Sequence, residues 1–141
     1  MTAAYVSAMV MSNWWARSEV GSELERARQA NARFMVTPVI GNPFRREIIV
    51  DVGDRYEKGQ LWFEPVPHFR PLGYGVEINE SDPAVAQARH IPRVQAFLMW
   101  SRFPFFVVER TAGRTRVVVN DYRYSGPSGR DGWATQVFDV P

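Results

Sequence analysis

Residues 97–106 read FLMWSRFPFF, the densest run of aromatic side chains in the chain. Pro104 ends any helix that precedes it, because a proline disfavours helical geometry at the residue before it. The segment then continues into the β-branched residues Val107 and Val108, which favour a strand. The run therefore predicts a helix followed by a strand, with much of its aromatic surface buried.

Downstream of this run, the pattern predicts three strands, at residues 105–111, 114–123 and 133–140. The dipeptide Ala112-Gly113 between the first two strands is typical of a tight hairpin. Upstream, Ser81-Asp82-Pro83 predicts the start of a short helix, because Ser and Asp cap helices and Pro suits the first turn. This helix runs to about Arg89, and a second one carries residues 91–100.

The first half of the chain after Asn31 also alternates with a period of two, which predicts strands at 33–39, 45–52 and 55–63. Three prolines between Glu64 and Tyr74 predict an extended loop or a sheet edge, since proline cannot donate to a strand ladder. A further short strand is expected near residues 74–79.

This order of elements predicts an α+β fold. We expect an antiparallel sheet of about six strands, arranged as two meanders joined by a helical crossover, with an N-terminal helix and the short helices packed on it. The expected domains are an N-terminal helix at residues 1–31 and a single α+β domain at residues 32–141.

The composition limits the chemistry. The chain has 141 residues, a net charge of +2 and no cysteine, which excludes disulfides, a thiolate nucleophile and cysteine-ligated metals. No run of clustered basic residues suggests a nucleic-acid tail, and nucleic acid is not an expected partner. The N-terminus lacks the order of charged, apolar and small residues that marks a signal peptide.

The N-terminal helix has two interpretations. Residues 3–15 carry no charge, end in Trp14-Trp15 and are followed by Arg17, which is the order found where a transmembrane helix leaves a bilayer. A run this short cannot cross by itself. The alternative is an amphipathic helix whose apolar side packs on the sheet through Tyr5, Met9, Ala16, Val20, Leu24 and Ala27. The two interpretations are compatible.

No catalytic, metal or cofactor site is predicted. Glu64 and His68 have a spacing that could ligate zinc on a helix, but the prolines between them exclude a helix. Asp121 and Arg123 are predicted to share one face of a strand, with Tyr122 and Tyr124 on the other, and such a pair is more often structural than catalytic.

Arginines recur beside aromatic residues, for example at Arg55-Tyr56 and Tyr122-Arg123-Tyr124. Such pairs could form a stacking surface for single-stranded nucleic acid. Cation–π pairs inside one folded sheet are commoner and are the favoured interpretation.

Four separated motifs carry a family resemblance: residues 37–46 (TPVIGNPFRR), 54–59 (DRYEKG), 97–105 (FLMWSRFPF) and 121–124 (DYRY). In this order they resemble the soluble C-terminal portion of the YdjM-like family, which are membrane-bound proteins named as metal-dependent hydrolases. The resemblance covers most of residues 3–141. It implies that the histidine-bearing, metal-binding part lies in an N-terminal membrane region, so no metal ligand is carried over to this chain.

The resemblance also implies that residues 3–17 form the exit from a last membrane span and that Met1 is not the native start. The expected function is a membrane-tethered accessory domain that is not catalytic by itself and binds a ligand, a membrane surface or the membrane-embedded region of the same protein. The alternatives are a small enzyme with a carboxylate-lined pocket, using Asp121 or Glu64, and a surface for nucleic acid or anionic lipid. The side of the membrane and the oligomeric state are not predicted.

The residues expected on a binding surface place polar or stacking groups beside backbone shaped by proline and glycine. They are Asn42, Arg45, Arg46, Tyr56, Trp100, Arg102, Asp121 and Arg123.

Overall fold

The structure is a computed structural model that describes residues 2–39, 41–126, 132 and 134–140. The chain divides into two compact units. Unit 1 comprises residues 1–53 and 57–74, and unit 2 comprises residues 54–56 and 75–141.

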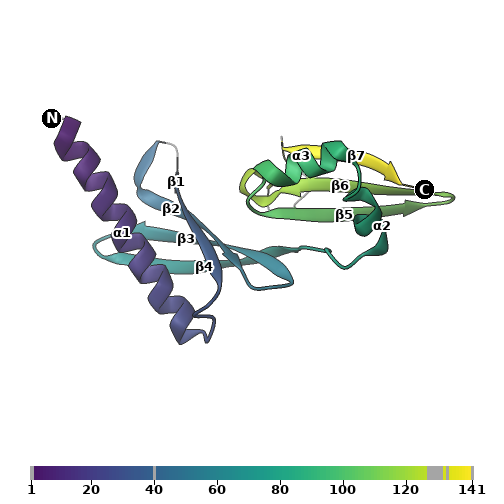
Figure 1. Ribbon diagram of the computed structural model, residues 1–141. Helices are drawn as coiled ribbons and strands as arrows, with labels where there is room; N and C mark the ends of the chain where they lie inside the picture. Colours follow the sequence, from purple (N-terminus) through teal and green to yellow (C-terminus); the bar gives the residue numbers. More distant parts are fainter. Residues whose placement is uncertain (1, 40, 127–131, 133, 141) are drawn as a thin grey trace. The chain divides into compact units, whose positions relative to one another are not determined.

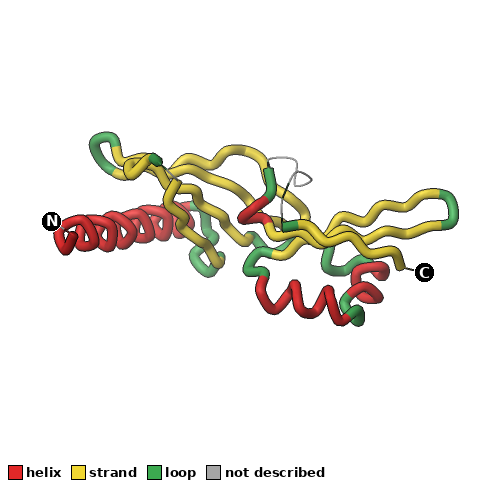
Figure 2. The backbone as a smooth tube through the Cα atoms, turned by 90° about the horizontal axis from the view of Figure 1, so that it is seen from above, coloured by secondary structure: helices red, strands yellow, loops and turns green. Residues whose placement is uncertain are grey.

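Helix α1 (Thr2–Arg26) opens unit 1 and lies along one side of a sheet (Figures 1 and 2). The sheet has the strand order β1-β2-β3-β4, and its strands are β1 (Arg33–Val39), β2 (Asn42–Asp51), β3 (Arg55–Phe63) and β4 (Pro67–Glu77). β1 and β2 pair antiparallel, and an ion pair of 3.0 Å between Arg33 and Asp51 joins their ends. β3 and β4 extend into unit 2 through residues 55–56 and 75–77.

The end of α1 follows from local backbone geometry. Arg28 has a φ of 60°, and the amide of Gln29 donates to the carbonyl of Leu24 at 2.7 Å. A left-handed residue with this six-to-one hydrogen bond is the Schellman helix end. The helix therefore ends a few residues before the predicted limit near Asn31.

The core of unit 1 lies between the C-terminal half of α1 and the sheet. It contains Ala16, Val20 and Leu24 from the helix, and Ile48, Val50 and Leu61 from the strands. The predicted docking of an amphipathic helix face is confirmed for these three helix residues. The side chain of Tyr5, also predicted to dock, lies outside the described residues.

The proline-rich segment is a strand rather than a loop. Pro67 and Pro71 lie inside β4, which is the last strand of its sheet. An edge strand tolerates proline because half of its amides need no partner within the sheet. The edge interpretation is therefore confirmed. The short strand expected near residues 74–79 is confirmed for residues 74–77, which are the end of the longer strand β4.

Unit 2 contains a three-stranded antiparallel sheet in the order β5-β6-β7: β5 (Pro104–Thr111), β6 (Arg114–Asp121) and β7 (Thr135–Val140). Two short helices, α2 (Pro83–Ala88) and α3 (Pro92–Trp100), lie on one side of it (Figure 2). As predicted, Asp82 caps α2 by accepting a hydrogen bond of 2.9 Å from the amide of Ala84.

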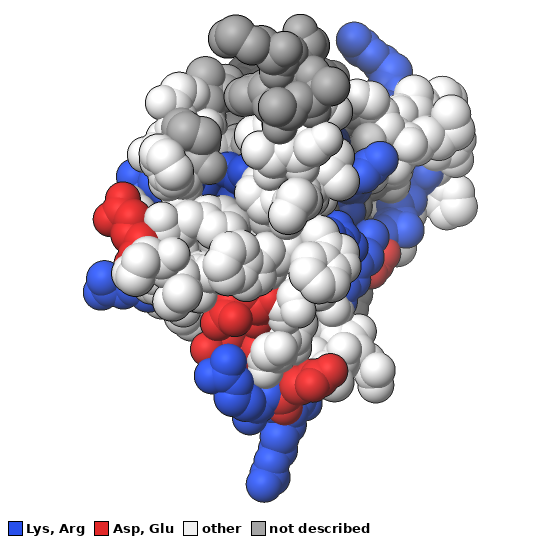
Figure 3. Space-filling model, turned by 90° about the vertical axis from the view of Figure 1, so that its left-hand side faces the viewer, with Lys and Arg blue, Asp and Glu red and all other residues white. Residues whose placement is uncertain are grey.

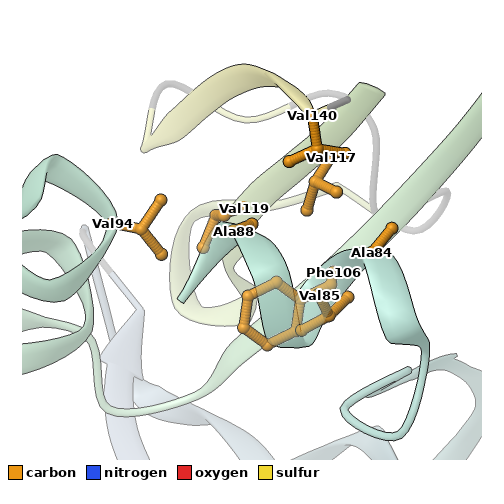
Figure 4. Close-up of a cluster of buried hydrophobic side chains, with 8 residues drawn as sticks. All are labelled: Ala84, Val85, Ala88, Val94, Phe106, Val117, Val119 and Val140. Atoms are coloured by element: carbon orange, nitrogen blue, oxygen red, sulfur yellow. The ribbon is translucent and has the colours of Figure 1, made fainter. Parts of the chain in front are cut away.

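The core of unit 2 is shown in Figure 4. Side chains of α2 and α3 meet those of the sheet in a single cluster, formed by Ala84, Val85, Ala88, Val94, Phe106, Val117, Val119 and Val140. Two other residues of the aromatic run, Phe103 and Phe105, are also buried. The prediction that much of this run is interior is confirmed, although Met99 and Trp100 remain exposed.

The α+β class and the two antiparallel meanders with a helical crossover are confirmed. The described strands number seven, in sheets of four and three, rather than about six in one sheet. The single domain expected at residues 32–141 stays a prediction. Trp133, at the predicted start of the last strand, lies outside the described residues.

The predicted strand at 114–123 is wrong at its end. Residues 122–124 form a 3₁₀ turn, η1 (Tyr122–Tyr124), capped by Asp121, whose carboxylate accepts from the amide of Arg123 at 3.0 Å. The alternation that assigned Asp121 and Arg123 to one strand face therefore does not apply. Tyr122 is fully buried and Tyr124 is half-buried.

Candidate functional site

An apolar groove of about 650 Å³ lies in unit 1 beside the N-terminal half of α1. Its walls come from the helix and from the start of β2 and the end of β3. The large side chains that line it are Met9, Met11, Trp14, Trp15, Phe44 and Phe63. Trp15 contacts Phe63 edge to face, with ring centroids 6.1 Å apart, and this contact joins the helix wall to the strand wall.

The helix beside this groove is apolar on its exposed sides as well. Val10 is 64% exposed and Trp14 is 72% exposed, whereas Val20, farther along the same helix, is completely buried. A helix that is hydrophobic all round is normally covered by protein or lipid. Figure 3 shows an area of uncharged side chains across the middle of this view, with acidic and basic side chains gathered below it.

A positive charge lies behind the groove. The guanidinium of Arg46 is buried, with only 1% of the residue exposed, and donates to the Ser12 hydroxyl at 2.9 Å and to the Arg45 carbonyl at 3.0 Å. It also lies 5.6 Å from the centre of the Phe63 ring. Because Ser12 and Phe63 both line the groove, Arg46 forms part of its inner support. These hydrogen bonds offset part of the cost of burying the charge.

The other two predicted site residues of unit 1 lie on β2. Asn42 shapes the start of the strand, with its side-chain oxygen accepting from the amide of Phe44 at 2.9 Å. Arg45 lies on the opposite face of the strand from Arg46, where it stacks over Trp62 at 4.1 Å and donates to Gln60 at 2.6 Å. The period of a strand places these two neighbouring residues on opposite faces, so the two predicted site residues do not share a surface.

In unit 2 the structure brings Trp100, Asp121 and Arg123 together. Trp100 stacks on Tyr124 with centroids 5.6 Å apart. The guanidinium of Arg123 lies 5.0 Å from the Trp100 ring and 4.8 Å from the Tyr124 ring. The expected cation–π pairing within the fold is therefore present in this cluster.

The buried carboxylate of Asp121 anchors this cluster through hydrogen bonds. This carboxylate is completely buried and accepts hydrogen bonds from the Arg123 guanidinium at 2.7 Å, the Ser101 hydroxyl at 2.6 Å and the Arg102 amide at 3.0 Å. Burial raises the pKa of Asp121, but the hydrogen bonds from Arg123, Ser101 and the backbone amides outweigh it, so the pKa lies below its usual value. The carboxylate is thus charged, saturated and out of reach of a substrate.

The remaining predicted residues of unit 2 separate from that cluster. Tyr56 is buried and stacks on Tyr122 at 6.2 Å, with Phe103 edge-on at 5.3 Å. Arg102 contributes only its backbone to the carboxylate of Asp121, and its side chain is exposed. Tyr56 thus serves the core, whereas Trp100 and Arg123 reach the surface.

The part of the chain that the structure describes contains neither a metal centre nor a membrane-spanning helix. Within the described residues, no three side chains of His, Cys, Asp or Glu are grouped so that they could hold a metal ion. None of the helices in the described part of the chain is long and apolar enough to cross a bilayer.

Sequence reasoning missed Phe44 and Phe63 as parts of a site. The uncharged run in α1 was recognised, but the strand residues that complete the groove are separated from it by more than 25 positions. A usable signal was the alternation of β3, which places Leu61 and Phe63 on the face that meets α1.

A comparison with protein families, curated proteins and solved structures finds no match for this chain, so the resemblance to the YdjM-like family stays a prediction.

Proposed function

We propose that this chain is a membrane-tethered accessory domain, not catalytic by itself, that contacts a lipid bilayer through the N-terminal half of α1 and the adjoining groove. The observation that carries the proposal is the exposure of Val6, Val10, Met11 and Trp14 on a helix segment without charge. Contiguous exposed apolar surface of this kind marks an interaction site.

The order of side chains supports lipid as the partner. Only Ala16 separates Trp14-Trp15 from Arg17, the first charged residue of the chain. Tryptophan prefers the headgroup level of a bilayer, and a cation beyond it lies where anionic headgroups are found. The apolar face and the exposed cation of Arg17 fit a helix that lies in the interface of an anionic bilayer.

The hydrophobic free energy of these exposed side chains is large enough for measurable binding to a bilayer. Each apolar side chain of this size that leaves water contributes about 1.5–3 kcal/mol. Since about 1.4 kcal/mol changes an affinity tenfold, replacing Met11 and Trp14 by serine should weaken binding at least tenfold. Neither side chain belongs to the buried core of unit 1, so the fold should persist.

The test is vesicle flotation with the whole chain. We expect binding to vesicles that contain phosphatidylglycerol, weaker binding to pure phosphatidylcholine, and loss of binding in the Met11→Ser, Trp14→Ser double variant. The matched control is Met99→Ser, because Met99 is 87% exposed but lies in unit 2. Failure of the unaltered chain to float with either vesicle, or equal loss in the control, contradicts the proposal.

The resemblance to the YdjM-like family adds the membrane-embedded region of the same protein as a proposed partner. It predicts that the coding sequence upstream of Met1 encodes several hydrophobic spans. A native start codon at Met1 would contradict this part of the proposal and leave the vesicle test unaffected.

A further inference from the structure

The sheet of unit 1 has a second face, opposite α1. Arg46, Ile48 and Val50 of β2 point to the buried side, so Arg45 and Glu47 point to the other. In β3 the same alternation turns Leu61 toward the core of the helix side. Among the described elements of unit 1, α1 is the only helix, and it covers only the first of these faces.

This second face is hollowed. A cavity of about 350 Å³ lies over β3 and β4, and its principal lining residues are Gln60, Trp62, Glu64, His68, Arg70 and Leu72. Its lining is mixed, with one large aromatic ring among charged and amide groups. Its volume is at the small end of the range for ligand sites, about 300–1,000 Å³. The chemistry and size therefore favour a small polar molecule over an acyl chain.

The cations at this hollow are available for a ligand. Arg45 contacts two lining residues, stacking over Trp62 at 4.1 Å and donating to the Gln60 oxygen at 2.6 Å. Its Nε is buried and makes no hydrogen bond with the described residues. Arg70 lines the hollow and is exposed. In the described part of the chain neither arginine pairs with a carboxylate.

The geometry also prepares one cation for binding. Stacking and the bond to Gln60 hold the Arg45 guanidinium in one orientation, so little side-chain entropy is lost when it pairs. A guanidinium recognises a phosphate or a carboxylate through two parallel hydrogen bonds. Among the lining residues the charge of Arg70 offsets that of Glu64, and the guanidinium of Arg45, which contacts the lining through Trp62 and Gln60, adds a positive charge that favours an anion.

We propose that this hollow binds a small molecule in which one anionic group is attached to a ring. Arg45 and Arg70 pair with the phosphate or carboxylate, and the partly exposed ring of Trp62 supplies the flat surface on which the ligand's ring stacks. Both a mononucleotide and a sugar acid have this chemistry. The site is separate from the apolar groove, because it lies on the opposite face of the sheet.

The test is calorimetric titration of the full chain with two matched pairs of probes. Adenosine 5′-monophosphate is compared with adenosine, and glucuronate with glucose. We expect at least one charged probe to bind and its uncharged partner to bind at least tenfold more weakly, and the pair that shows this difference identifies the source of the ring. No binding of either charged probe at millimolar concentration, or equal binding of a charged probe and its partner, would overturn the proposal.

Substitutions assign the roles. Arg70→Gln should weaken binding of the charged probe at least tenfold, and folding is not at risk because this side chain is exposed. Arg26→Gln is the matched control, an exposed arginine at the end of α1 that does not line the hollow. Trp62→Phe should retain binding and Trp62→Leu should weaken it. Inorganic phosphate that binds as tightly as the nucleotide would refute the role of the ring.

Discussion

Both units cover one face of an antiparallel sheet with helix, but they use the apolar residues of their helices differently. In unit 2, the helices bury Val85 and Val94 completely and place them in the same cluster as Phe106. In unit 1, α1 buries Val20 completely and leaves Val10 64% exposed. The comparison shows that an apolar residue in a helix is not necessarily part of the hydrophobic core. Where the helix leaves the sheet, the same residue types remain exposed.

The units also bury opposite charges. Unit 2 buries the carboxylate of Asp121 and pairs it with Arg123 at 2.7 Å. Unit 1 buries the guanidinium of Arg46 and bonds it to the hydroxyl of Ser12 at 2.9 Å. In unit 2, Arg123 also contacts the rings of Trp100 and Tyr124. In unit 1, Arg46 contacts Ser12 and Phe63, which line the apolar groove.

The largest effect is expected in the core of unit 2. Phe106→Ala should lower the free energy of unfolding by about 3–5 kcal/mol, because it removes a ring from a closely packed cluster. Urea denaturation followed by circular dichroism measures it. Met99→Ala, in an exposed position of α3, should change the free energy by less than about 0.5 kcal/mol. If Phe106→Ala and Met99→Ala lowered the free energy of unfolding by similar amounts, the cluster around Phe106 would not be closely packed.

A somewhat smaller effect is expected at the buried carboxylate. Asp121→Asn should destabilise the protein by about 3 kcal/mol at neutral pH, because it leaves Arg123 without its charged partner. The pKa of Asp121 is lower in the folded state than in the unfolded chain, where it is about 3.9. The stabilisation is therefore complete well above pH 4 and is lost as the pH falls through the lower folded-state value.

Urea denaturation of both proteins between pH 7 and pH 2 checks this, and the difference between them should shrink only below about pH 4. Asp139→Asn is the control, since its ion pair with Arg116 is exposed on both sides and contributes about 0–1 kcal/mol. A difference between Asp121→Asn and the unaltered protein that does not vary with pH would contradict the assigned ionisation.

The smallest effect on stability is expected in α1, where a buried and an exposed valine can be compared. Val20→Ala should reduce stability by about 1.5–3 kcal/mol, because it removes two buried methyl groups. Val10→Ala removes the same groups from an exposed position and should change stability by less than about 0.5 kcal/mol. Amide hydrogen exchange of unit 1 measures both. Equal destabilisation would show that the N-terminal half of α1 is part of the core and would remove the surface on which the proposed function depends.

Most of the local structure could be predicted from the chain. Asp82 and Pro83 mark the start of α2, and Gly113, with a φ of 79°, marks the hairpin between β5 and β6. Capping and turn geometry depend on a few neighbouring residues, so they can be recognised without the fold. The error at residues 122–124 also concerns local geometry, over a few neighbouring residues. The side chain of Asp121 offers a backbone amide a local partner and ends the strand, whereas alternation alone suggested that it continued.

The candidate site was predictable only in part. The uncharged run before Arg17 is visible in the sequence, and so is the pairing of arginine with aromatic residues. Alternation assigns Phe63 to the face that meets α1 but does not show that a groove opens there, and the sequence does not reveal which aromatic residue Arg45 stacks on. These contacts join residues far apart in the chain, and their partners are chosen by strand pairing.

The amino-acid sequence by itself determined the class of fold, the order of helices and strands, and the lack of thiol chemistry, because these depend on residue type and on spacing over a few positions. Only the tertiary structure decided that the strands form two sheets, that Arg45 stacks on Trp62, and that half of an apolar helix remains uncovered. The physical reason is that burial and stacking depend on which surfaces, distant in the sequence, meet in the fold.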